Sequence, residues 1–222
     1  MFSPSMMERF VHKIDEKTRN IFASNRKKQL NNSDFTIISN NCWGGIAYEY
    51  YGIPKLSPTV GTYFFADDYI KFITNLQYYL SKPIIFITAE ESKYRDTLYE
   101  RGEKDIPIGV LGDVEIVFLH YKSIDIARDK WNRRIRRVNY NNLVAKFSRM
   151  NSCNDEHLKI FDQIDIKKKF MFVNNNDKKY NCAIYYPGFE ENEQIENDTF
   201  YWNKYFNVTA FLNGNGIIEY NL

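Results

Sequence analysis

The stretch from Phe35 to Gly45 reads F-T-I-I-S-N-N-C-W-G-G, and it decides the fold class. Its first four residues are apolar or β-branched, which is typical of a short buried strand. Polar residues and then two glycines follow at once, and this order indicates a strand that passes through a loop into a helix. Strands that alternate with helices favour a parallel sheet, because parallel neighbours need a crossover connection.

The same alternation continues along the chain. Beyond residues 35–38, the apolar runs predict strands at 83–88, 108–111, 114–121, 143–147 and 170–173, and short strand-like pieces at 182–186 and 208–212. Helical spacing predicts helices at 5–30, 67–80, 123–138 and 154–164, with a charged and partly helical stretch at 90–104. We therefore predict a three-layer α/β fold, with a mainly parallel sheet, helices on both faces, and an antiparallel edge or cap formed by the C-terminal tail.

The length and composition suit one domain. The chain has 222 residues, of which 44% are hydrophobic, and a chain of this length buries roughly 70% of its unfolded surface without needing a disulfide or a metal. We divide it into an N-terminal helix at 1–32, a core at 33–175 and a C-terminal edge or cap at 176–222. The net charge of +2 argues against a strongly basic nucleic-acid scaffold, so nucleic acid is not an expected partner.

Cysteine usage and the absence of targeting signals indicate the cytoplasm. The three cysteines are far apart and odd in number, which makes a disulfide framework improbable. The first residues lack the pattern of a signal peptide, and no run of 18 apolar residues would span a membrane. Peripheral contact of the N-terminal helix with a membrane stays open as an alternative to its packing on the domain.

Candidate catalytic residues follow the predicted strands. Asn40, Asn41 and Cys42 come after the first strand, and His120 closes the strand predicted at 114–121. Because the carboxyl ends of parallel strands meet at one edge of a sheet, we expect these residues to share a crevice. Cys42 at a helix start would gain a lowered thiol pKa and could act as a nucleophile, with His120 as base and an Asn side chain to orient it. The alternatives are a small buried thiol in a tight turn and a histidine that bonds a neighbouring loop.

Candidate ligand-binding residues lie in two glycine-containing turns and one basic run. The turns contribute Trp43, Gly44 and Gly45, and then Ser57, Thr59 and Gly61; neither turn is a standard dinucleotide or P-loop motif. The amide groups of a glycine-rich helix start can still hold a phosphate. In the basic run from residue 130 to 137, Arg133 and Arg134 could bind a diphosphate through their planar guanidinium groups. The alternative is a solvated helix face paired with local acids.

Evidence for a metal or cofactor is weak. Asp113 and Glu115, in the order D-V-E, faintly resemble the acidic pair with which some sugar-nucleotide enzymes hold a divalent metal. We expect His12 and His157 to be surface residues, and with no C-x-x-C pair a structural zinc site is not predicted. We therefore assign no metal ligands and leave the cofactor unknown, while Asp113 stays a candidate catalytic residue.

Several motifs in a fixed order resemble a known family. They are N-N-C-W-G-G within residues 40–45, S-P-T-V-G at 57–61, D-Y-I-K-F at 68–72, D-V-E-I-V-F-L-H-Y at 113–121 and K-W-N-R-R at 130–134. Over roughly residues 33 to 175 the chain is similar to a bacterial domain-of-unknown-function family associated with exopolysaccharide biosynthesis. The resemblance implies a role in surface-polysaccharide assembly and a sugar or nucleotide-sugar ligand.

These observations lead to one main hypothesis and two alternatives. The main hypothesis is a cytoplasmic transferase that acts on a sugar or an activated sugar. The first alternative is a non-catalytic carbohydrate-binding or assembly protein, in which the abundant aromatic side chains would stack on sugars. The second is an acyl transferase or hydrolase that depends on Cys42. The sequence predicts neither the acceptor nor the oligomeric state.

Overall fold

The structure is a computed structural model, and it describes residues 13, 18, 21–176 and 179–220. Most of the helix predicted at 5–30 lies outside these residues. The described part contains α2 (Ala23–Lys27), which follows a turn at Ile21 and Phe22. Both of these side chains are exposed, although the helical spacing placed them on a buried face.

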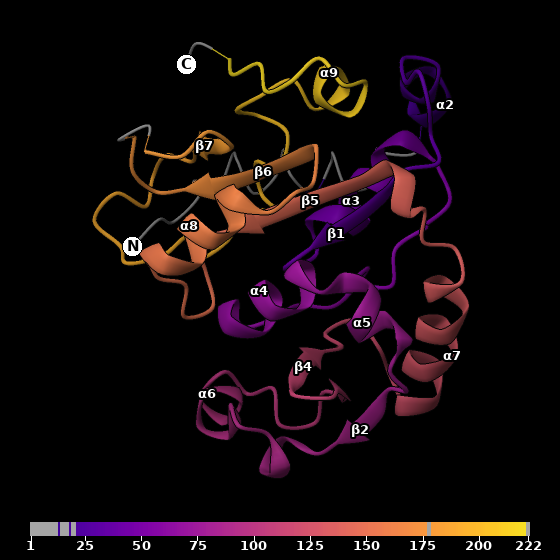
Figure 1. Cartoon of the computed structure of the whole chain (residues 1–222), viewed down its shortest axis with the longest axis vertical. Helices are drawn as coiled ribbons and strands as arrows, with labels where there is room; N and C mark the ends of the chain where they lie inside the picture. The colour runs from indigo at the N-terminus through magenta and orange to yellow at the C-terminus, as the bar shows by residue number, and fades with distance from the viewer. Residues whose placement is uncertain (1–12, 14–17, 19–20, 177–178, 221–222) are drawn as a thin grey trace.

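Four parallel strands form the main sheet. In space their order is β1 (Thr36–Ser39), β5 (Leu143–Ser148), β6 (Lys168–Val173) and β7 (Ala183–Tyr185), and each pairs in parallel with its neighbour. Figure 1 shows these strands side by side, with helices on both sides of the sheet. The strands β1, β5 and β6 are buried along most of their length, as expected for strands that are covered on both faces. The predicted α/β class is confirmed.

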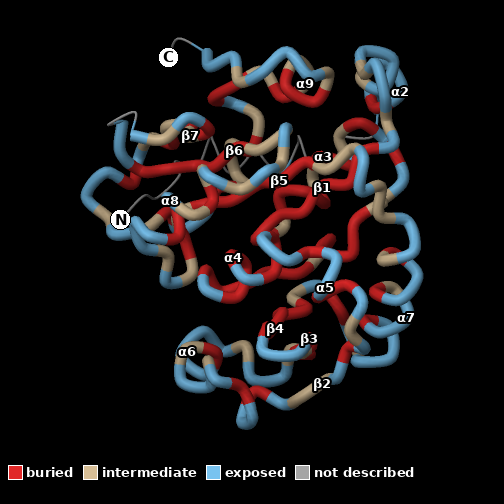
Figure 2. Tube along the Cα trace, in the orientation of Figure 1, coloured by how far each residue is buried: buried red, intermediate tan, exposed pale blue. Residues whose placement is uncertain are grey.

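Helices and the tail cover both faces of this sheet. Along β1, Ile37 and Ile38 point to opposite faces and belong to different clusters of the core. The cluster of Ile37 includes side chains of α3 (Trp43–Tyr51) and α9 (Val208–Leu212). The cluster of Ile38 includes side chains of α4 (Ala66–Thr74), α5 (Leu76–Ser81), α7 (Ile124–Ile135) and α8 (Asp155–Gln163). Figure 2 shows the buried trace running through the sheet and the inner sides of these helices.

A second, antiparallel sheet lies at the other end of the molecule (Figure 1). It consists of β2 (Ile85–Ile87), β3 (Ile108–Leu111) and β4 (Val114–Val117), in that order. The expectation that His120 and Asn41 end strands of one sheet is therefore wrong. The physical reason is the short turn at Gly112 and Asp113, since two residues can connect antiparallel strands but not parallel ones. Two short helices, η1 (Ala89–Glu91) and α6 (Arg95–Glu100), lie between β2 and β3.

The helix α7 begins where the sequence predicts. The Ser123 hydroxyl caps it by accepting a hydrogen bond from the Ile126 amide at 3.4 Å. Trp131 is buried and packs edge-on against Phe118, which follows β4. A single 3-10 turn, η2 (Tyr140–Asn142), then leads into β5. Within the described residues, no helix combines the length and the hydrophobicity that crossing a bilayer would require.

The C-terminal tail covers the sheet instead of adding a strand at 208–212. That segment is the helix α9, capped by the Asn207 side chain, which accepts a hydrogen bond from the Ala210 amide at 2.9 Å. The prediction of a strand there is wrong, because the cap and the packing of Phe211 edge-on against Phe170 outweigh the β propensity of Val208 and Thr209.

A buried ion pair fixes the tail on the sheet edge. Lys146 of β5 and Asp198 of the tail are both fully buried and form a salt bridge. Asp198 also accepts hydrogen bonds from Ser148 and, at 2.7 Å, from the Asn41 side chain. Lys146 donates further bonds to the amide oxygens of Asn41 at 2.9 Å and Asn40 at 3.3 Å. Groups of the protein thus satisfy both buried charges.

We predict that Asp198→Asn lowers the free energy of unfolding by about 3–5 kcal/mol, because it leaves the buried Lys146 ammonium without a countercharge. Urea denaturation measures this loss. The matched control is Glu196→Gln, a change at an exposed residue two positions before Asp198, which should change stability by less than about 0.5 kcal/mol. Equal stability of Asp198→Asn and the native protein would contradict this interpretation.

Candidate functional site

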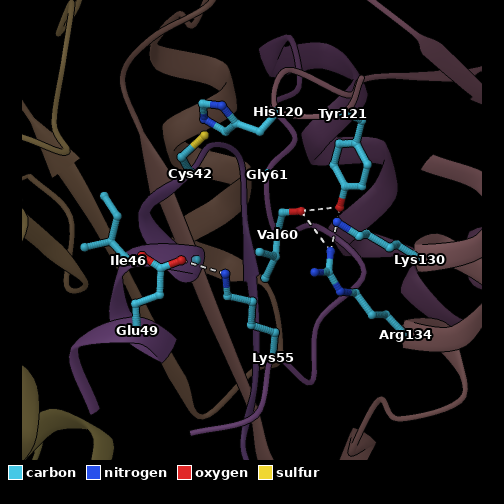
Figure 3. A pocket seen from close by; sticks show the side chains of 11 residues that line it. Cys42, Ile46, Glu49, Lys55, Val60, Gly61, His120, Tyr121, Lys130 and Arg134 are labelled. Atoms are coloured by element: carbon cyan, nitrogen blue, oxygen red, sulfur yellow. Dashed lines mark hydrogen bonds and ion pairs between the residues drawn. The ribbon is translucent and has the colours of Figure 1, made fainter. Parts of the chain in front are cut away.

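One pocket lies between α3, the loop after α3, the loop after β4 and α7 (Figure 3). Its volume is about 250 Å³. The lining residues are Cys42, Gly45, Ile46, Glu49, Lys55, Val60, Gly61, His120, Tyr121, Lys130 and Arg134. The pocket therefore combines residues that follow the first strand with residues carried by the antiparallel sheet.

Backbone contacts bring these segments together. Tyr63 pairs with Val117 through two backbone hydrogen bonds of 2.9 Å, and the His120 amide donates to the Gly61 carbonyl at 3.1 Å. Gly61 has φ of +79°, and a Cβ atom there would lie 3.2 Å from the ring of Tyr121. Only glycine fits this position without strain, so the S-P-T-V-G motif holds the loop against the His120 segment.

Cys42 and His120 share the pocket, as the sequence predicts, although they come from different sheets. Figure 3 shows the Sγ atom of Cys42 directed toward the imidazole ring of His120. Burial and the negative charge of Asp198 raise the pKa of the Cys42 thiol to about 11, against a lowering by the nearby Lys146. The thiol is therefore protonated near neutral pH, which weighs against Cys42 as a nucleophile in the free protein.

Asn40 and Asn41 are buried and do not line the pocket. The side-chain amide of Asn40 donates to the Ser148 carbonyl at 3.2 Å, and the side-chain oxygen of Asn41 accepts from the backbone amide of Trp43 at 3.1 Å. The second bond sits at the first turn of α3 and so helps to place Cys42, the residue just before it. The sequence analysis missed Lys146 and Asp198, the partners of these side-chain amides. The available signal for a buried polar site was Lys146, a lysine within an otherwise apolar strand.

Arg134 enters the pocket, whereas Arg133 does not. Arg134 is only 8% exposed, and its Nη1 donates to the Val60 carbonyl at 3.1 Å and to the Tyr121 hydroxyl at 2.5 Å. Arg133 is exposed and does not line the pocket. Lys130, one helical turn before Arg134, lines the pocket with its ammonium 5.4 Å from the centre of the Tyr121 ring.

The pocket carries an excess of positive charge. Its one carboxylate, Glu49, forms a 2.6 Å ion pair with Lys55. Among the described residues, no carboxylate lies within 4 Å of the charged groups of Lys130 or Arg134. Lys130 and Arg134 thus give the lining side chains two positive charges that no carboxylate of the pocket compensates, so the arrangement favours an anionic ligand.

The predicted ligand residues Trp43 and Gly44 pack against the protein core and do not line the pocket. Trp43 is fully buried, and its indole donates to the Trp202 carbonyl at 2.8 Å. A Cβ atom on Gly44 would meet Ile37 at 3.1 Å, so this glycine lets α3 approach the sheet closely. Gly45 is the member of this turn that lines the pocket.

Ser57 and Thr59 are buried in the loop after α3. Their hydroxyl oxygens lie 3.0 Å apart, and the Thr59 oxygen accepts from the Ser39 amide at 3.3 Å. Neither residue lines the pocket. They hold the loop on the end of β1 and in this way position Val60 and Gly61.

Asp113 lies in the β3–β4 turn, apart from the pocket-lining residues. It forms a 2.7 Å ion pair with Lys71 and accepts from Tyr79 at 2.9 Å, and the hydrogen bond from Lys71 lowers the pKa of Asp113. The other acid of the D-V-E motif, Glu115, accepts from Ser92 and from the Lys93 amide. Protein donors thus occupy both carboxylates, and the described residues contain no cluster of three potential metal ligands.

The histidines outside the pocket have different positions. His12 lies outside the described residues. The prediction that His157 is a surface residue is wrong, because it is 8% exposed and its Nε2 lies 2.7 Å from Asp67. Its Nδ1 accepts from the Asn154 amide at 3.0 Å and completes the cap of α8, which explains its burial.

Comparison with known proteins places the chain in a family. A family profile described as "Domain of unknown function (DUF1919)" matches residues 13–214. The chain belongs to this family. The match includes every residue that lines the pocket. A protein of Haemophilus influenzae, described as an uncharacterized protein, is 29% identical to the chain over 182 residues, which cover 82% of each protein.

We predict that alkylation of Cys42 is slow at neutral pH and accelerates about tenfold per pH unit up to about pH 11, because only the thiolate reacts. Iodoacetamide labelling of a Cys153→Ser, Cys182→Ser variant isolates this thiol. The same variant unfolded in urea is the control and should label faster below pH 9. A rate that levels off below pH 8 in the folded protein would instead indicate an activated nucleophile.

Proposed function

We propose that the protein is a cytoplasmic transferase that acts on a sugar or an activated sugar in the assembly of a surface polysaccharide. The observation that carries the proposal is the pocket that His120 shares with two cations, which have no carboxylate partner among the described residues. The similarity of its motifs to a family associated with exopolysaccharide biosynthesis supports the choice of a sugar substrate.

The residues of the pocket suit a direct transfer. His120 would accept the proton of an acceptor hydroxyl, and the freed oxygen would bond to the anomeric carbon of the sugar. The bond from that carbon to the leaving group breaks at the same time, and the leaving group departs with the electron pair. Lys130 and Arg134 would stabilise the negative charge that develops on it.

A direct transfer fits this pocket better than a covalent one. The raised pKa of Cys42 keeps the thiol protonated at neutral pH, and protonated thiols are poor nucleophiles. Cys42 would instead pack against the substrate next to His120. A protonated Cys42 favours the sugar transferase over the Cys-dependent acyl transferase or hydrolase.

The test is turnover of nucleotide sugars. UDP-glucose and GDP-mannose are incubated with the protein and an oligosaccharide acceptor, and the released nucleoside diphosphate is followed by phosphorus NMR. We predict that His120→Ala lowers turnover of the accepted donor by about 10²- to 10⁴-fold with little change in its Kd, because the base is lost and the cations remain. Lys122→Ala, an exposed change two residues away, is the control.

Two results would contradict the proposal. Turnover that survives His120→Ala would remove the histidine from the chemistry. Tight binding of a donor or an oligosaccharide without any release of diphosphate would favour the alternative of a non-catalytic carbohydrate-binding or assembly protein.

A further inference from the structure

The guanidinium group of Arg134 is buried with only part of its hydrogen-bonding capacity used. Arginine has five N–H donors, and both bonds that Arg134 makes to described residues come from Nη1. Nε and Nη2 donate no hydrogen bond to any described residue. Donors left unpaired in a buried charged group are costly, and so they indicate a missing acceptor.

The geometry of Arg134 indicates which acceptor fits. The Tyr121 hydroxyl donates to the Val60 carbonyl at 2.6 Å, and Nη1 bonds to both oxygens, so the guanidinium plane is fixed. The free edge is the Nε–Nη2 fork, whose two parallel N–H groups match two oxygens of a phosphate or carboxylate. In Figure 3 the guanidinium group is directed toward the middle of the lining side chains.

The charge of the site points to phosphate. Lys130 adds a second cation from the preceding turn of α7, since residues four apart share a helix face. The two partners of Nη1, a carbonyl and a hydroxyl, are neutral, and the Glu49 carboxylate is engaged by Lys55. An excess of two positive charges is matched by a group with two negative charges, such as a phosphate, better than by one carboxylate.

We propose that the Nε–Nη2 edge of Arg134 and the ammonium of Lys130 form a binding site for a phosphate group. This site deepens the proposed function: the substrate is a phosphorylated or diphosphate-linked sugar, not a free one. Only the sugar part of that substrate rests on the proposed function. The volume of about 250 Å³ lies below the usual range of ligand pockets, about 300–1,000 Å³, so the pocket accommodates a small phosphorylated group or one part of a larger ligand.

Calorimetry with pyrophosphate and inorganic phosphate tests this site without any turnover. We expect Arg134→Gln and Lys130→Gln each to weaken pyrophosphate binding about ten- to hundredfold, because each removes a charged hydrogen bond. Arg134→Lys keeps the charge but not the fork, so it should bind more weakly than the native protein and more tightly than Arg134→Gln. The matched control is Arg133→Gln, the exposed neighbour on the same helix, for which binding should change less than twofold.

The outcomes distinguish a phosphate site from a purely structural role of Arg134. Because Arg134 also supports Val60, thermal denaturation checks each variant for folding, and Lys130→Gln tests the site independently of that support. Failure of the native protein to bind pyrophosphate, or equal weakening by Arg133→Gln, would overturn the inference. Pyrophosphate binding that depends on Arg134, without any sugar transfer, would leave the site standing and overturn the proposed function. Sugar transfer that is unaffected by Arg134→Gln would overturn the phosphate site and the role of Arg134 toward the leaving group, and would leave only the sugar-transferase activity standing.

Discussion

The buried ion pair between Lys146 and Asp198 is the interaction on which the arrangement of the site depends. Two charges removed from water cost several kcal/mol each, and here Asn40, Asn41 and Ser148 offset that cost by hydrogen bonds. The pair joins β5, the segment after β1 and the C-terminal tail. Lys146 thereby fixes the side-chain oxygen of Asn41, which accepts a hydrogen bond from the Trp43 amide in the first turn of α3. This bond in turn positions Cys42, which precedes Trp43 and lines the pocket.

The pocket lies between segments that follow two different sheets of the chain. The parallel sheet supplies the start of α3, and the antiparallel sheet supplies the His120 segment. The loop after α3 connects them, because Tyr63 pairs with Val117 and Gly61 accepts from the His120 amide. The helix α7 then closes the site with two cations. A proposed sugar-phosphate substrate would contact all of these parts, so its binding would depend on the contact between the sheets.

Much of the fold could be predicted from local patterns. The strand, loop and helix order from Phe35 to Gly45 and the cap of α7 at Ser123 follow from short-range physics, and both predictions are confirmed. Sheet membership could not be predicted, because an apolar run such as residues 114–118 suits either kind of sheet. The two-residue turn at Gly112 and Asp113 was the available signal for the antiparallel hairpin.

The site was predictable to a smaller extent. Residue type and position predicted Cys42, His120 and Arg134 as site residues, and these three residues line one pocket. The sequence analysis did not separate Arg134 from Arg133, although helical spacing was an available signal: Arg134 follows Trp131 by three residues and Ala127 by seven, and so lies on the buried face of α7. It also could not reveal Asp198, whose partner Lys146 is 52 residues away in the sequence. Long-range pairing of this kind depends on the tertiary fold.

The central claim is that this pocket binds the phosphate of a sugar substrate between Arg134 and Lys130, next to His120. A crystal structure of the protein soaked with a nucleoside diphosphate sugar tests it most directly. We predict phosphate oxygens at about 2.7–2.9 Å from Nε and Nη2 of Arg134, with the sugar facing His120. Phosphate bound elsewhere on the protein, with the pocket between α3 and α7 unchanged, would contradict the claim.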